Sequence, residues 1–437
     1  MSAAHSSALA EDLYLKLTDE EDARVCEDIS DDACVETPQN FLLILLSHFF
    51  TRLGDAVASP KTVLAWVTTA VGAPVFVLGL LVPVRESGSM IPQLFIGGVI
   101  RRMPVRKWVW VAGSLAQAFC VLGIGFVVMT LTGNGAGWAI LSLVVLFSLA
   151  RGFCSVAAKD VLGKTIPKRK RGQLTGWSAS AAGMVTLGVA LFLILSPRDS
   201  QVTTLGWLLV GAGSLWIVAA LIYSRVREYS GETAGGGNAA VEALKRLSIL
   251  RDDKAFRRFV IARALLMCSA LSAPFYVALA QGALGSVTYL LGLFVLADGL
   301  ASLVSAPVWG RAADRSSKRV MLIAALITAS TGAVVFAADL LFPGLVGTAW
   351  FVPAAYFVLC IAHNGVRVGR KTYVVDLASG NRRTDYVAVS NSLIGVLLLV
   401  VGSVGGLVPL LGYGGVIAVL ALMGFAGALF SYALPET

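Results

Sequence analysis

The chain is built from apolar blocks of about twenty residues or more, separated by short polar connections. A block of this length crosses the hydrocarbon core of a bilayer as an α-helix. Of the 437 residues, 57% are hydrophobic and 14% are charged, which is more apolar surface than a water-soluble domain can bury. The short alternating segments of a membrane β-barrel are not present in the sequence. The sequence therefore predicts an all-α integral membrane protein.

The blocks predict about twelve transmembrane helices, with ends good to a few residues. We place them at about 41–70, 74–101, 107–131, 137–162, 172–196, 204–223, 256–280, 286–310, 319–341, 347–373, 385–409 and 412–432. Pro60 and Lys61 interrupt the first block, which predicts a kink or break there.

Charge alternates along the connections between these blocks. Lys and Arg cluster in the connections at 101–107, 164–171, 224–258, 311–319 and 370–383. The alternate turns near Gly72, Gly133, Gly282, Pro343 and Gly412 carry no Lys or Arg, and the remaining one holds only the pair Arg198 and Asp199. Because positive charge in short loops marks the cytoplasmic side, we expect both termini in the cytoplasm and a location in the inner or plasma membrane.

Composition divides the chain into four segments. Residues 1–40 hold eleven acidic residues against Lys16 and Arg24, which indicates an acidic cytoplasmic tail. Residues 224–255 contain the flexible stretch GETAGGGN and then AAVEALKRLSIL, whose apolar spacing suggests an amphipathic helix on the membrane surface. We therefore expect an N-terminal six-helix half at 41–223, a cytoplasmic linker at 224–255 and a C-terminal six-helix half at 256–437.

The two halves also repeat at the level of single residues. A shift of 212 positions superposes Glu86 on Asp298, Arg151 on His363, Lys159 on Lys371 and Arg171 on Arg383, without an insertion. Two six-helix pseudo-repeats in the same orientation are a plan of secondary transporters, which bind their solute near the midplane between the halves.

Two basic loops carry a motif in corresponding positions, GVIRRMPVRK at Gly98–Lys107 and GRAADRSSKR at Gly310–Arg319. With the PKRKRGQLTG stretch at Pro167–Gly176, they make the chain resemble the major facilitator superfamily over essentially all of its spans. That family favours G-x-L-A-D-R-x-G-R-K in the first loop, where this chain has Arg102 in place of the acid. The resemblance implies that these loops switch between conformations. The residues concerned are Gly98, Arg102, Arg106, Lys107, Gly310, Asp314, Arg315, Lys318 and Arg319.

Charged residues also lie inside the blocks, where a charge costs a few kcal/mol and needs a cavity or a partner. Arg85 and Glu86 are adjacent, so on a helix they point about 100° apart and need partners on other helices. Arg52 and Asp55 share one face of the first span at a similar depth. This predicts the pairs Arg52–Glu86 and Asp55–Arg85.

Further charged residues lie at comparable depth in later spans, and the resemblance implies that most of these spans line a central cavity. The candidates for solute binding or ion coupling are Arg52, Asp55, Arg85, Glu86, Arg151, Arg263, Asp298, His363 and Arg367. A buried pair can equally be a static tie between helices, and His363 can be an ordinary hydrogen-bonding group. We expect Arg151 to contact an anionic group of the solute, and Glu86 to exchange a proton.

The sequence thus predicts a secondary active transporter that moves a small anionic or zwitterionic organic solute by alternating access, driven by protons. An amphiphile or drug exporter is the second interpretation, and a receptor or scaffold that does not transport is the third. No GxxxxGK[ST] motif and no catalytic constellation occurs in the sequence. We therefore expect no enzyme activity, no cofactor, no metal and no nucleic acid, and a monomer in contact with lipid.

Overall fold

The chain is described here by a computed structural model. It describes residues 11, 14–15, 31–92, 96, 99–100, 102–196, 202–231, 233, 249–377 and 381–436. Most of the acidic tail, most of the predicted amphipathic helix and Gly98 lie outside these residues. Within them the regular structure is helical, as the sequence predicts.

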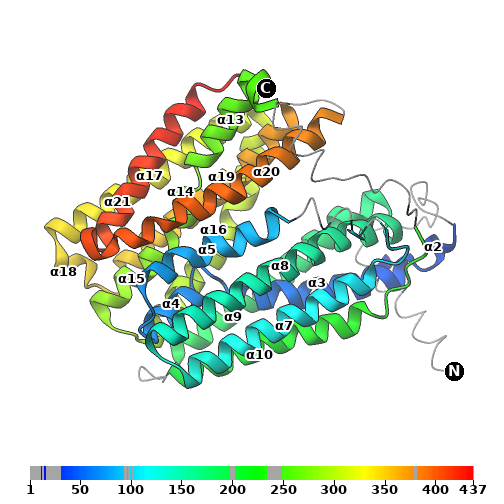
Figure 1. Cartoon of the computed structure of the whole chain (residues 1–437), viewed down its shortest axis with the longest axis horizontal. Coiled ribbons are helices and arrows are strands. Elements are labelled where there is room, and N and C mark those ends of the chain that lie inside the picture. Colours follow the sequence, from blue (N-terminus) through cyan, green and yellow to red (C-terminus); the bar gives the residue numbers. More distant parts are fainter. Residues whose placement is uncertain are drawn as a thin grey trace.

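The helices form two groups, which Figure 1 shows one above the other. The N-terminal group follows the short α2 (Asp31–Val35) and consists of α3 (Thr37–Val57), α4 (Val63–Ala70), α5 (Val75–Met90), α7 (Lys107–Thr130), α8 (Gly133–Thr165), α9 (Lys168–Leu195) and α10 (Val202–Tyr223). The C-terminal group consists of α12 (Ile249–Asp252), α13 (Lys254–Leu265), α14 (Cys268–Leu271), α15 (Ala273–Leu284), α16 (Thr288–Arg315), α17 (Ser317–Leu341), α18 (Pro343–Val346), α19 (Phe351–Asp376), α20 (Asn381–Gly402), the 3₁₀ turn η1 (Ser403–Leu407) and α21 (Val408–Tyr432).

The first apolar block is broken where the sequence predicts it. Helix α3 ends at Val57 and α4 begins at Val63, with Pro60 between them. Proline has no N–H and cannot continue a helical ladder. The ladder resumes where the Trp66 N–H donates to the Thr62 carbonyl at 2.8 Å. The break places polar backbone and the side chain of Lys61 in the middle of an apolar segment.

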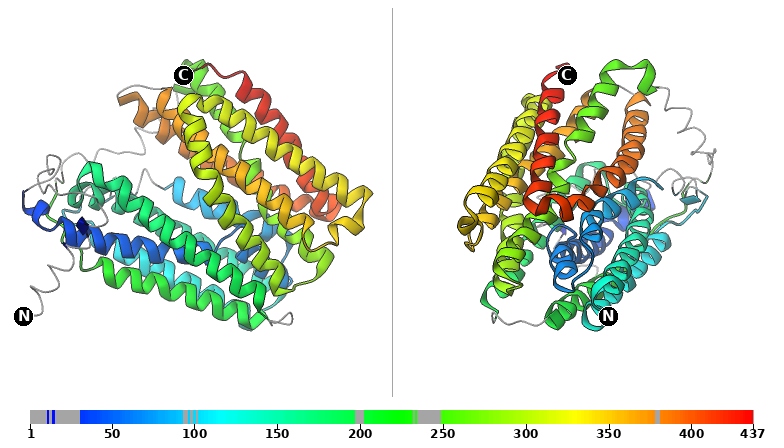
Figure 2. Two further views of the ribbon diagram at one scale, coloured as in Figure 1. Left: turned by 180° about the vertical axis from the view of Figure 1, so that it is seen from behind. Right: turned by 60° about the vertical axis from the view of Figure 1, so that its left-hand side comes forward.

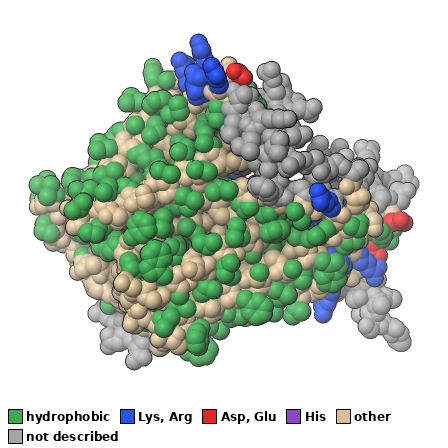
Figure 3. All heavy atoms as spheres, viewed as in Figure 1, with side chains coloured by type: hydrophobic (Ala, Val, Ile, Leu, Met, Phe, Trp, Pro, Cys, Tyr) green, Lys and Arg blue, Asp and Glu red, His purple; other side chains and the backbone are tan. Residues whose placement is uncertain are grey.

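Nine helical segments in the described part of the chain are long and apolar enough to cross a membrane. Large apolar side chains are exposed on their outer faces, for example Phe119 (68%), Leu422 (69%) and Leu429 (71%). Figure 3 shows hydrophobic side chains over most of one face, with Lys and Arg gathered toward the upper and right-hand margins. The chain is a multi-pass membrane protein.

One end of the molecule, here called the charge-poor end, carries the turns without Lys or Arg. Four of these turns use a glycine with positive φ: Gly72 (+70°), Gly133 (+64°), Gly285 (+81°) and Gly412 (+71°). This backbone conformation is open to glycine and strained for most other residues. The turn expected near Gly282 is formed at Gly285 instead, because α15 continues to Leu284.

The two groups meet toward the charge-poor end, where α9 packs on α16 and α5 packs on α20 and η1. The contact is close, because a Cβ atom on Gly79 would lie 2.8 Å from the Cα of Gly405. The Ser87 hydroxyl donates to the Gly395 carbonyl at 2.7 Å. Figures 1 and 2 show the groups diverging toward the opposite, charge-rich end, where the described part of the chain ends near the label C.

Candidate solute site between the two helix groups

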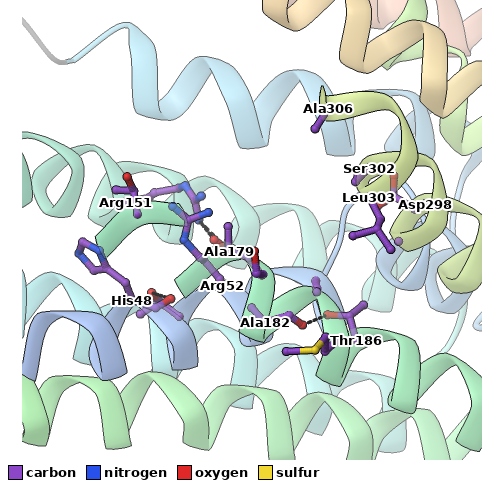
Figure 4. Close-up of a pocket in the computed structure, with 18 of the residues that line it drawn as sticks. His48, Arg52, Arg151, Ala179, Ala182, Thr186, Asp298, Ser302, Leu303 and Ala306 are labelled. Atoms are coloured by element: carbon purple, nitrogen blue, oxygen red, sulfur yellow. Dashed lines mark hydrogen bonds and ion pairs between the residues drawn. The ribbon is translucent and has the colours of Figure 1, made fainter. Parts of the chain in front are cut away.

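A cavity of about 1010 Å³ lies between the two groups. Helices α3, α8 and α9 line it from the N-terminal group, and α16 and α19 line it from the C-terminal group. Figure 4 shows the basic side chains on one side and Asp298, Ser302 and Leu303 of α16 on the other. The polar and charged lining residues are His48, Thr51, Arg52, Asp55, Thr62, Gln117, Arg151, Ser155, Lys159, Thr175, Ser180, Thr186, Asp298, Ser302 and Arg367.

Asp55 is the centre of a charge cluster at the cavity wall. Its carboxylate accepts a hydrogen bond from Arg85 at 2.7 Å, which confirms the predicted pair. It also accepts two from Arg151, at 2.5 and 2.6 Å. The Arg85 guanidinium lies 4.1 Å from the centre of the Phe147 ring, a cation–π contact. One carboxylate therefore ties α3, α5 and α8 together, and the cluster keeps one positive charge.

The predicted pair between Arg52 and Glu86 is not formed, although the structure describes both residues. Arg52 turns into the cavity instead. Glu86 lies within electrostatic range of Arg370 and Lys371 of α19, in the other group. Glu86 is also within electrostatic range of Arg85 and Arg151 of its own group. Arg85 thus ties its own group together, whereas Glu86 lies among cations from both groups.

The described lining of the cavity is basic. Arg52, Arg151, Lys159 and Arg367 oppose two carboxylates, Asp55 and Asp298. Arg52 and Arg367 belong to opposite groups and repel one another electrostatically. Neither Arg52 nor Arg367 forms an ion pair with a described residue. Arg85 and Arg151, by contrast, both pair with Asp55.

Two further candidates lie apart from the cavity lining. The buried Arg263 of α13 donates to the Ser390 hydroxyl and to Asn391 Oδ1 of α20, each at 2.8 Å, and so joins two helices of its own group. The ring of His363 hydrogen-bonds the Ser269 hydroxyl at 3.1 Å. Both side chains thus have structural partners.

The first signature loop is held by acids that the sequence reading missed. Arg106 forms an ion pair with Asp160 of α8. The buried carboxylate of Glu228, beyond α10, accepts hydrogen bonds from the backbone N–H groups of Arg106 and Lys107 at 2.6–3.0 Å and from Lys164 at 3.0 Å. Arg102, where the family motif has its acid, is exposed.

The second signature loop is looser. Gly310 is part of α16, and a Cβ atom added there would meet nothing within 4 Å. Asp314, Arg315 and Arg319 are exposed. Lys318 lies 3.6 Å from Glu436, whose side chain is 61% exposed. The two corresponding loops thus differ in how firmly the structure holds them.

Comparison with known proteins places this geometry in a wider context. No family model matches the chain. An uncharacterized protein of Mycobacterium tuberculosis (strain H37Rv) is 23% identical over 390 residues, covering 85% of this chain and 73% of the relative. An uncharacterized protein of Mycobacterium bovis matches equally well.

Solved structures resemble the chain over nearly its whole length. A D-xylose–proton symporter superposes with a TM-score of 0.69 at 16% identity, covering 91% of this chain and 97% of the symporter. A nucleoside transporter gives 0.68 at 13% identity, with coverages of 90% and 99%. A POT family transporter in complex with 5-aminolevulinic acid gives 0.70 at 10% identity, with coverages of 90% and 96%. A further structure, described as a major facilitator superfamily proton:xylose symporter, gives 0.58 at 17% identity, with coverages of 91% and 96%. The chain described here has the fold of the major facilitator superfamily transporters.

Proposed function

We propose that the protein is a secondary active transporter of small organic anions, including zwitterions that carry a carboxylate or phosphate. Its twelve spans would form two six-helix pseudo-repeats, with α3 and α4 together making the first span. The two groups would rock about the cavity and expose it to each side of the membrane in turn. The fold shared with sugar, nucleoside and peptide-family transporters supports this mechanism.

The single observation that carries the solute class is the pair Arg52 and Arg367. Both guanidinium groups line the cavity, from opposite helix groups and within electrostatic range of one another, and neither forms an ion pair with a described residue. Asp55, the acid within electrostatic range of Arg52, is already held by Arg85 and Arg151. An anion between them would remove their repulsion and bind both groups at once. A hydrogen bond to a charged group contributes about 1.5–3 kcal/mol, so two such contacts suffice to select an anion over a cation.

The orientation follows from the loop charges. The charge-rich end would face the cytoplasm together with both termini, in the inner or plasma membrane. The groups touch toward the charge-poor end and diverge toward the charge-rich end, so the structure would represent a cytoplasm-facing state of a monomer. A proton is the coupling ion we favour, because Glu86 and Asp298 both lie near the boundary between the groups.

The test is transport by the purified protein in liposomes that contain a pH-sensitive dye. The external solutes are carboxylates, organophosphates, zwitterions and lipophilic cations, each offered alone. We expect a proton flux with one class of anion or zwitterion. We expect the apparent affinity to fall at least tenfold in Arg367→Gln, about 1.4 kcal/mol. Arg258→Gln, an exposed arginine of α13, is the control.

Other outcomes distinguish the alternatives. A response to lipophilic cations alone would favour the exporter interpretation. If no solute gives a proton flux and none binds in a thermal-shift assay, the result would favour a receptor or scaffold. An unchanged anion affinity in Arg367→Gln would reject the proposed site while leaving the fold untouched.

A further inference from the structure

The two helix groups meet along two boundaries that correspond to one another in the repeat. The α5–α20 seam is the contact of α5 with α20 and η1, and the α9–α16 seam is the contact of α9 with α16. The shift of 212 positions between the halves relates Ile91 to Leu303 and Gly183 to Gly395. The packing of the two seams can therefore be compared residue by residue.

Both seams are tightly packed toward the charge-poor end. In the α5–α20 seam, a Cβ atom on Gly79 would lie 2.8 Å from the Cα of Gly405. In the α9–α16 seam, a Cβ atom on Gly292 would lie 2.8 Å from the backbone nitrogen of Ile194. The charge-poor ends of the two seams are thus closed to a similar degree.

The seams differ further from that end. In the α5–α20 seam, a Cβ atom on the buried Gly395 would lie 2.8 Å from Cγ1 of Ile91, and the Ser87 hydroxyl bonds the Gly395 carbonyl. In the α9–α16 seam, the corresponding Gly183 and Leu303 both line the cavity. A Cβ atom on Gly183 would meet no described atom within 4 Å, and Leu303 is 63% exposed. The α9–α16 seam is open where the α5–α20 seam is closed.

The opening lies at the depth of the lipid chains. Gly183 is twelve residues from Leu195 and Leu303 is fifteen residues from Thr288, which are the ends of α9 and α16 at the charge-poor end. At 1.5 Å per residue these positions are about 18 and 22 Å from that end, within a hydrocarbon core of about 30 Å. The opening therefore connects the cavity with the apolar layer of the membrane.

Apolar surface continues from the cavity to the outside of α16. Leu303 and Pro307 line the cavity one turn apart. Val304 (54% exposed) and Val308 (55%) follow each of them directly, on the neighbouring face of the helix. Figure 4 shows Leu303 on the α16 side of the cavity, across from Ala179 of α9.

The other edge of the opening is apolar as well. Met184 of α9 lines the cavity and is 68% exposed. The sequence has no charged residue at 172–195 of α9 or at 299–310 of α16. An opening with such edges favours an alkyl chain over a polar group, because burying each CH₂ group strengthens binding about fourfold.

We propose that the solute is a single-chain anionic amphiphile, whose carboxylate or phosphate binds Arg52 and Arg367 while its alkyl chain passes between α9 and α16 to the bilayer. The two arginines supply the charge complementarity, since both line the same cavity without an ion pair to a described residue. The inference rests on the proposed transport function and names the class of solute for the same site.

The first test is binding of synthetic anions to the purified protein in nanodiscs. The compounds are butanoate and dodecanoate, and butyl and dodecyl phosphate. We expect each dodecyl compound to bind at least a hundredfold more tightly than its short counterpart. Gly183→Leu, which places a side chain in the opening, should reduce this ratio at least tenfold. Partitioning into the nanodisc is the same for every variant and cancels from the comparison.

Gly188→Leu is the matched control for Gly183→Leu. Gly188 lies on the same helix outside the cavity lining, and a Cβ atom there would also meet no described atom within 4 Å. This variant should keep the full ratio of affinities. Size-exclusion chromatography shows whether each variant is folded. If Gly183→Leu is not, Leu303→Gln removes apolar surface from the opposite edge and should also lower the ratio.

The outcomes separate this inference from the proposed function. Arg367→Gln should weaken the long and the short anions alike, and the series that it weakens more identifies the head group as carboxylate or phosphate. If long and short anions bind equally to the wild type, or if folded Gly183→Leu keeps the full ratio, the inference is overturned while anion transport stands. If no anion binds, the proposed function fails and the inference fails with it. Dodecyltrimethylammonium bound as tightly as dodecyl phosphate would overturn the anionic head group.

A second measurement locates the chain. Dodecyl phosphate that carries a diazirine at the end of its chain is photolysed on the protein, with and without an excess of unmodified dodecyl phosphate. Labelling that the excess suppresses should fall at 176–187 of α9 and 300–308 of α16. Suppressed labelling at 87–91 and 391–398 instead would place the chain in the α5–α20 seam and overturn the assignment.

Discussion

The guanidinium of Arg151 donates to both carboxylate oxygens of Asp55, at 2.5 and 2.6 Å, while Arg85 holds the same carboxylate from a third helix. Removing the Asp55 carboxylate should lower the stability of the protein, because the two guanidinium groups would then repel one another.

Asp55→Asn should destabilise the protein strongly. Truncating one partner of a buried, hydrogen-bonded charge pair costs about 2–5 kcal/mol, and the partly exposed Asp55 should fall at the lower end of that range. Thermal unfolding of the detergent-solubilised protein measures the effect. The exposed Asp314→Asn should change stability by no more than about 0.5 kcal/mol. Equal stability of the two variants would contradict the role given to the cluster.

Arg263→Gln should lower stability and leave solute affinity unchanged. Its guanidinium bonds Ser390 and Asn391 within one helix group and does not line the cavity. Losing hydrogen bonds made by a charged donor costs about 1.5–3 kcal/mol. Unfolding and solute binding, measured on the same preparation, separate the two effects. A weakened affinity with normal stability would place Arg263 in the solute site.

Glu228→Gln should loosen the first signature loop. The buried Glu228 carboxylate caps the first N–H groups of α7 and pairs with Lys164, and a negative charge is favourable at a helix N-terminus. Backbone amide exchange at 105–107 and 224–231 should accelerate at least tenfold, which corresponds to a loss of about 1.4 kcal/mol in the free energy of local opening. Glu436→Gln is the matched control, since its exposed pair with Lys318 contributes little. Comparable effects of both variants would argue against the cap.

Gly79→Ala should hold the two groups apart at the charge-poor end. A Cβ atom there would lie 2.8 Å from the Cα of Gly405, whereas one on Gly211 of α10 meets nothing within 4 Å, which makes Gly211→Ala the control. Spin labels at the exposed Leu131 and Leu341 report the separation of the groups. We expect longer distances in Gly79→Ala only. An unchanged distribution of distances between the spin labels would show that α5 and η1 accommodate the added methyl group without moving the two groups apart.

The sequence predicts the height of a charged residue in the membrane better than the direction in which it points. Asp55 and Arg85 pair as expected, since depth and helical face both match. Arg52 and Glu86 have suitable depths too, but Arg52 lines the cavity and Glu86 lies among cations of both groups. The rotation of a helix about its axis is set by packing between helices, which no local pattern records. The expected Arg52–Glu86 pair is therefore wrong.

The local sequence predicts well where a helix is interrupted or ends, and predicts poorly which distant residues are in contact. Pro60 marks the interruption of the first span because it cannot donate to the helical ladder. The turn predicted near Gly282 forms at Gly285, because α15 continues through Gly282 to Leu284. A helix tolerates one glycine at a cost of about 1 kcal/mol. The contact between Glu228 and Arg106 cannot be predicted from the sequence, because the four helices α7 to α10 separate the two residues along the chain.

If the charge-poor end faces outward, as proposed, its tight glycine turns also limit what can be recognised from outside the cell. Among the described connections at that end, Val71–Pro74, Leu131–Thr132 and Gly285–Val287 have only two to four residues each. These short connections offer an antibody or a phage little protruding chain. Binders that trap one conformation are therefore best raised against the loops at the other end, where Arg106 and Glu228 hold a folded surface.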